Sequence, residues 1–129
     1  MTLNELKDFI RVNYPSFFNI GADWDNRVFV EFNKSLFPNT VYITENSILA
    51  AFKDENIITV CDLINLEGLD KDSLPFIETY KSRYLDLDVT DEFVLKIILD
   101  RLVNRLKELQ VQIKELMINR KLNDINEDF

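Results

Sequence analysis

Apolar residues recur at alternating spacings of four and three along the last third of the chain. This heptad pattern predicts one face of a long helix from about Thr90 to Leu122, with acidic residues at its start, where the helix dipole favours negative charge. The apolar positions, which we call the seam, are Leu95, Leu99, Leu102, Leu106, Leu109, Ile113 and Leu116. A seam of this length needs a second surface to cover it, from the same chain or from a neighbouring molecule.

The expected length of this helix limits how much of it one small domain can cover. Thirty residues of α-helix span roughly 45 Å, whereas a globule of this chain length has a radius of gyration of about 14 Å. We therefore expect part of the helix to project or to lie against another molecule. Three surfaces could cover the seam: the chain's own domain, a second copy of the chain, or a different protein.

The start of the chain predicts a short helix followed by two strands. Thr2 and Glu5 have the spacing of a capping box, apolar residues follow on one face, and the pair Tyr14-Pro15 ends the helix. Further on, apolar and other residues alternate at Val28, Val30 and Phe32 and again at Val41 and Ile43. This alternation predicts two strands joined by residues 33–39 as a β-hairpin.

The middle of the chain has the spacing of three short helices, each with a polar cap. They are Thr44 before Ile48, Leu49 and Phe52; Thr59 before Val60, Leu63, Ile64 and Leu66, with Gly68 at the end; and Ser73 before Phe76, Ile77, Tyr80 and Tyr84. The predicted fold is thus α+β and mostly helical: an N-terminal helix, a β-hairpin, three short helices and a long C-terminal amphipathic helix. We expect a compact acidic head over 1–89, the long helix over 90–122 and an acidic tail over 123–129.

Composition and charge limit the class of protein. The chain has 129 residues, 47% of them hydrophobic, and a net charge of −8, which fits one folded acidic domain. The charge is −8 over 44–92 but +4 over 93–122. A lone Cys61, no signal peptide and no membrane-length apolar run predict a cytoplasmic protein. The bias toward Asn, Ile, Lys and Phe fits an AT-rich genome such as that of many phages.

The residues that most enzymes use are scarce. The chain has no histidine and one cysteine, and its glycines, Gly21 and Gly68, stand apart, so neither a common catalytic triad nor a phosphate-binding loop can be built. The run Asp23-Trp24-Asp25-Asn26 begins like a calcium loop but has Val28 where that loop needs glycine, and we interpret it as a turn. Trp24 is either a core residue or an anchor for a partner. We expect no enzymatic activity, cofactor or metal.

Two functions remain. In the first, the protein is an interaction or assembly adaptor whose seam binds a protein partner, either a second copy or a larger complex. In the second, it is an inhibitor or decoy whose acidic surface blocks the basic site of a nucleic-acid-binding protein. That acidic surface comprises Glu67, Asp70, Asp72, Asp86 and Asp88. Its net negative field disfavours direct binding of nucleic acid.

Overall fold

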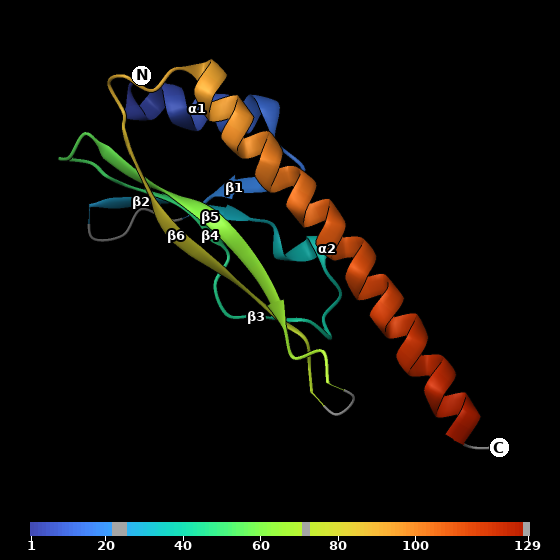
Figure 1. The fold of residues 1–129 in the computed structure, drawn as a ribbon. Helices are drawn as coiled ribbons and strands as arrows, with labels where there is room; N and C mark the ends of the chain where they lie inside the picture. The colour runs from blue at the N-terminus through green and yellow to red at the C-terminus, as the bar shows by residue number, and fades with distance from the viewer. Residues whose placement is uncertain (22–25, 71–72, 128–129) are drawn as a thin grey trace.

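The computed structural model describes residues 1–21, 26–70 and 73–127, with the backbone alone for 126 and 127. Within these residues, six strands form one mixed sheet and two α-helices lie on the same face of it (Figure 1). The elements are α1 (Leu3–Asn13), β1 (Phe18–Ile20), β2 (Arg27–Phe32), a 3-10 helix (Lys34–Leu36), β3 (Tyr42–Ile43), β4 (Ser47–Phe52), β5 (Ile57–Glu67), β6 (Phe76–Asp86) and α2 (Glu92–Glu127). The strand order is β1-β2-β4-β5-β6-β3.

The prediction of a mostly helical fold with three short helices is wrong. The segments assigned to those helices form β4, β5 and β6, the centre and one side of the sheet. Their proposed caps have other roles: the Thr59 hydroxyl lies within β5 and donates to the Ala50 carbonyl, while the Thr44 hydroxyl donates to the Ile77 carbonyl. Gly68 adopts a positive φ of 75° in the turn that follows β5.

Local irregularity explains why these strands have helical spacing. Between β5 and β6 the register shifts at Val60/Cys61 and again at Cys61/Leu63. Such bulges break the two-residue alternation of a strand, so buried and exposed positions no longer alternate along β5. In β4, the run Ile48-Leu49-Ala50-Ala51 is buried throughout, and a register shift against β2 between Val30 and Glu31 interrupts the alternation there as well. Both patterns imitate a helix when they are taken from the sequence alone.

The predicted hairpin is also wrong in its pairing. β2 pairs in antiparallel fashion with β1 and β4, whereas β3 pairs in parallel with β6, where Tyr42 lies opposite Phe76. The predicted strands therefore exist, but they are separated by three other strands of the sheet. Alternation identifies a strand without identifying its neighbour.

The two predicted terminal helices are present. In α1, the Thr2 hydroxyl accepts from the Glu5 amide and the Glu5 carboxylate accepts from the Thr2 amide, which completes the capping box. Helix α2 is continuous over 36 residues and ends beyond the predicted boundary. Among the described residues, no helix is both long enough and apolar enough to cross a membrane.

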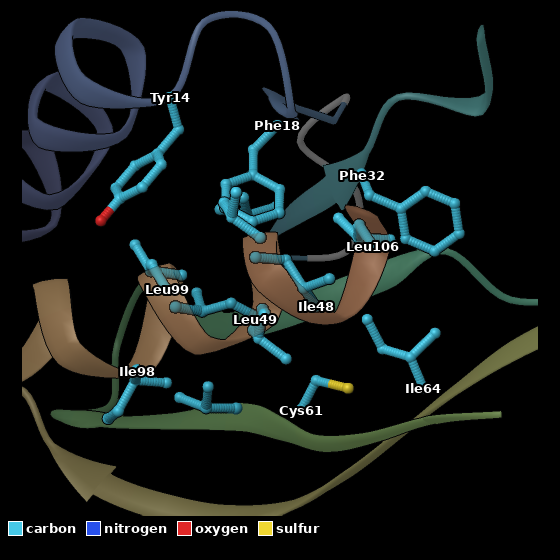
Figure 2. Close-up of a cluster of buried hydrophobic side chains, with 14 of the residues drawn as sticks. Tyr14, Phe18, Phe32, Ile48, Leu49, Cys61, Ile64, Ile98, Leu99 and Leu106 are labelled. Carbon is cyan, nitrogen blue, oxygen red and sulfur yellow. The ribbon is translucent and has the colours of Figure 1, made fainter. Parts of the chain in front are cut away.

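One core joins the sheet to both helices. Side chains from the strands and from Tyr14 gather around Leu99 and Leu106 of α2 (Figure 2). Cys61 belongs to this core, where burial raises the pKa of its thiol. These contacts hold the first two thirds of α2 against the sheet and leave its opposite face outward.

Candidate interaction surface

The seam faces the chain's own sheet. Its first six residues, Leu95 to Ile113, are at most 5% exposed, and Leu116 is half-buried. The covering surface is built from buried residues of the strands, among them Phe32, Ile48, Leu49 and Ile64 (Figure 2). The seam therefore forms the core of this structure, and in this conformation it offers no free surface to another molecule.

Polar bonds fix α2 from both sides of the seam. On one side, the Gln110 amide donates to the Leu36 carbonyl at 2.9 Å. On the other side, Nε of Arg105 donates to the Ile64 carbonyl at 3.2 Å. Nearer the C-terminus, Nη2 of Arg120 donates to the carbonyls of Gly68 and Asp70. The rotation of α2 about its own axis is therefore set, and with it the residues that point outward.

Tyr14 and Asp100 form the clearest electrostatic coupling between α2 and the N-terminal region. The Tyr14 hydroxyl donates to Oδ1 of Asp100 at 2.7 Å, and Lys96 lies 3.1 Å from the other carboxylate oxygen. The bond from Tyr14 lowers the pKa of the Asp100 carboxyl. Burial, together with this bond, raises the pKa of the Tyr14 hydroxyl. Both shifts follow from the packing of Tyr14 against α2.

A second apolar stripe runs along the outward face of α2. Ile97, Val111, Ile118 and Ile125 follow one another at multiples of seven residues and are 45% to 56% exposed. Asn104, also exposed, occupies the one remaining position of this spacing. We call these five residues the outer stripe. Successive positions of the outer stripe lie about 10 Å apart along the helix axis, so these residues form a line of separate apolar side chains on one face of α2.

Two rows of charged residues flank the outer stripe. Residues three positions after a stripe residue lie on one side of it, and residues four positions after lie on the other side. The first row is Asp100, Lys107, Lys114 and Lys121, and the second row is Arg101, Glu108, Glu115 and Leu122. At the first three levels the two rows carry opposite charges, and at the fourth Lys121 lies beside the uncharged Leu122.

A cleft between β5, β6 and α2 holds three arginines. It has a volume of about 420 Å³ and is lined by Arg83, Arg101 and Arg105 together with Asp62 and Glu108. Nε of Arg83 lies 2.9 Å from the Asp62 carboxylate, and Arg105 pairs with Glu108 at 3.3 Å. Arg101, in contrast, has no hydrogen bond or ion pair within the part of the chain that the structure describes.

The predicted acidic surface lies at two separate places. Asp86 and Asp88 lie together, since both carboxylates accept from the Asn56 side-chain amide. Glu67 and Asp70 lie at the opposite end of the β5–β6 hairpin, roughly 30 Å away along eleven-residue strands. Asp72, like Asp23, Trp24 and Asp25, lies outside the described residues. Among the residues that are described, no group of three or more potential ligands is placed to hold a metal.

Comparison of the chain with protein families, curated proteins and solved structures found no match. The candidate site therefore depends on the geometry of this molecule alone. The sequence analysis predicted the seam as a partner interface, and the structure places its first six residues in the core of this chain. The seven-residue spacing of the outer stripe was present in the sequence, but the denser pattern of the seam obscured it.

Proposed function

We propose that this protein is a non-enzymatic interaction or assembly adaptor that binds a protein partner through the outer face of α2. The observation that carries the proposal is the exposed outer stripe on a helix whose inner face is already occupied. Exposing four large aliphatic side chains in one line costs solubility, and a partner that covered them would remove this apolar surface from water. The lone cysteine suits action in a reducing cytoplasm.

The rigid attachment of α2 also supports the proposal. A helix that is packed on a sheet and tied by Gln110, Arg105 and Arg120 presents its outer face without further ordering. Binding to such a surface loses less conformational entropy than binding to a flexible tail does. The acidic-decoy alternative has less support, because the described acids form two distant groups.

Site-specific photo-crosslinking in cells that produce the protein tests this proposal. Benzoylphenylalanine placed at position 111 or 118, one at a time, should yield a discrete protein adduct. The matched controls are positions 12 and 89, where Val12 and Val89 are 77% and 79% exposed but lie outside α2. The proposal is wrong if positions 111 and 118 give no adduct, or give the same adducts as the controls.

A further inference from the structure

We infer that the partner of the outer stripe is a second copy of this chain, whose α2 lies parallel to the first and in register with it. This inference rests on the proposed function and names its partner. It is carried by the two charge rows beside the outer stripe, which complement each other in one arrangement of two copies.

Symmetry determines which rows meet. Two parallel helices that join stripe to stripe are related by a twofold axis parallel to both, so the first row of each copy faces the second row of the other. In register, Asp100 then faces Arg101, Lys107 faces Glu108, and Lys114 faces Glu115. These three levels pair opposite charges, Lys121 faces the uncharged Leu122 at the fourth, and the twofold axis repeats each pair.

The antiparallel arrangement lacks this complementarity. Its twofold axis is perpendicular to the helices, so each row faces the same row of the other copy. With the outer stripes fully overlapped, Lys107 faces Lys114 and Glu108 faces Glu115, while Asp100 faces Lys121, so two of these three contacts join like charges. Like charges at close range disfavour this orientation, and the charge pattern therefore selects the parallel one.

Two further features of the helix fit this arrangement. Arg101, which has no partner in the described part of its own chain, obtains one in Asp100 of the second copy. Asn104 meets Asn104 of the second copy, and a single polar layer of this kind fixes register in parallel pairs at some cost in stability. Because only one residue in every seven would bury an apolar side chain between the two helices, we expect a weak dimer that dissociates on dilution.

Charge reversal with sedimentation velocity tests the pairing at about 10 to 500 μM protein and low salt. The variants E108K/E115K and K107E/K114E each place like charges across the interface, and we expect each to dimerise about tenfold more weakly or worse. A mixture of the two should recover the dimer, because every altered row then faces its opposite. The control E55K/E67K makes the same change in net charge as E108K/E115K, on exposed residues of the head, and should dimerise like the wild type.

Disulfide trapping tests the orientation. In a C61A background, I97C and I118C should each form a disulfide with the same position of the second copy. An antiparallel pair cannot bring both positions against their own counterparts, because only residues near its crossing point do so. Circular dichroism confirms that each variant is folded, which we expect since every substituted position on α2 is exposed.

The outcomes separate this inference from the proposed function. A wild-type protein that stays monomeric at 500 μM, while position 111 crosslinks to a different protein, overturns the second copy as partner and leaves the adaptor proposal intact. A dimer unaffected by either charge reversal places the interface elsewhere on the molecule. A dimer that responds to charge but traps only one of the two cysteines overturns the parallel register.

Discussion

The two faces of α2 carry apolar residues of the same kind but in different surroundings. The seam lies against the sheet and is at most 5% exposed as far as Ile113, whereas the aliphatic residues of the outer stripe are about half exposed. The difference teaches that an apolar stripe indicates a contact but not which contact it is. Here one stripe contributes to folding, and we propose that the other contributes to association.

The largest effect should come from placing charge within the seam. Leu102→Glu with Leu109→Glu would bury two carboxylates without partners, which should cost more than about 5 kcal/mol, comparable to the whole stability of a small domain. Circular dichroism should show an unfolded or strongly destabilised chain. The matched variant V111E/I118E alters the outer stripe and should unfold at nearly the wild-type temperature. A normally folded seam variant would contradict the packing of α2 on the sheet.

A milder pair of substitutions makes the same comparison quantitative. Leu106→Ala leaves a cavity at a fully buried site and should destabilise the protein by about 2–5 kcal/mol. Ile118→Ala removes an exposed side chain and should change the stability of the monomer by less than about 0.5 kcal/mol. Urea denaturation at low protein concentration measures both values. Similar losses in the two variants would mean that the two faces of α2 do not differ in burial.

Tyr14→Phe should have a smaller effect that depends on pH. It removes the bond to Asp100 but keeps the ring contacts with Phe9 and Phe18, and it should cost about 1 kcal/mol near neutral pH. Because the pKa of folded Asp100 is lowered, its contribution is present above the ordinary carboxyl pKa of about 4 and is lost as pH falls through the folded value. The difference between variant and wild type in urea should therefore shrink below about pH 4. A difference that is constant from pH 7 to pH 2 would show that the bond does not depend on the ionised carboxylate.

Arg120→Gln should have the smallest effect of this series. Arg120 ties the end of α2 to the turn after β5, where half-exposed groups contribute less than about 1 kcal/mol. Hydrogen exchange should show faster exchange of the Ser73 amide, which donates to the Asp70 carbonyl in that turn. Unchanged exchange there would mean that the turn is held without α2.

The two ends of the chain were predictable because their signals are local. A capping box, a Tyr-Pro stop and a sustained heptad pattern each act within a few residues, and they identified α1 and α2. The secondary-structure prediction for the middle of the chain was wrong because the signals there are not local. Bulges next to Cys61 and the fully buried run in β4 are consequences of neighbouring strands, which sequence spacing does not identify.

The candidate site, too, has features that the sequence predicts and features that only the fold determines. The residues of the outer stripe can be found in the sequence from their seven-residue spacing. Both charge rows follow from it, because their members lie three or four positions after a stripe residue. Their outward orientation cannot, because it depends on the sheet having covered the seam. The sequence also grouped Asp70 with Asp86, although the hairpin separates them by its whole length.

By itself, the sequence determined that a long amphipathic helix occupies the last third of this acidic chain and that the chain has no histidine and one cysteine. The tertiary structure alone decided that 47–52, 57–67 and 76–86 form strands, and that one face of α2 is core while the other meets solvent. The physical reason is that helical periodicity arises within a single segment, whereas strand pairing and burial are set by contacts between residues far apart in the chain.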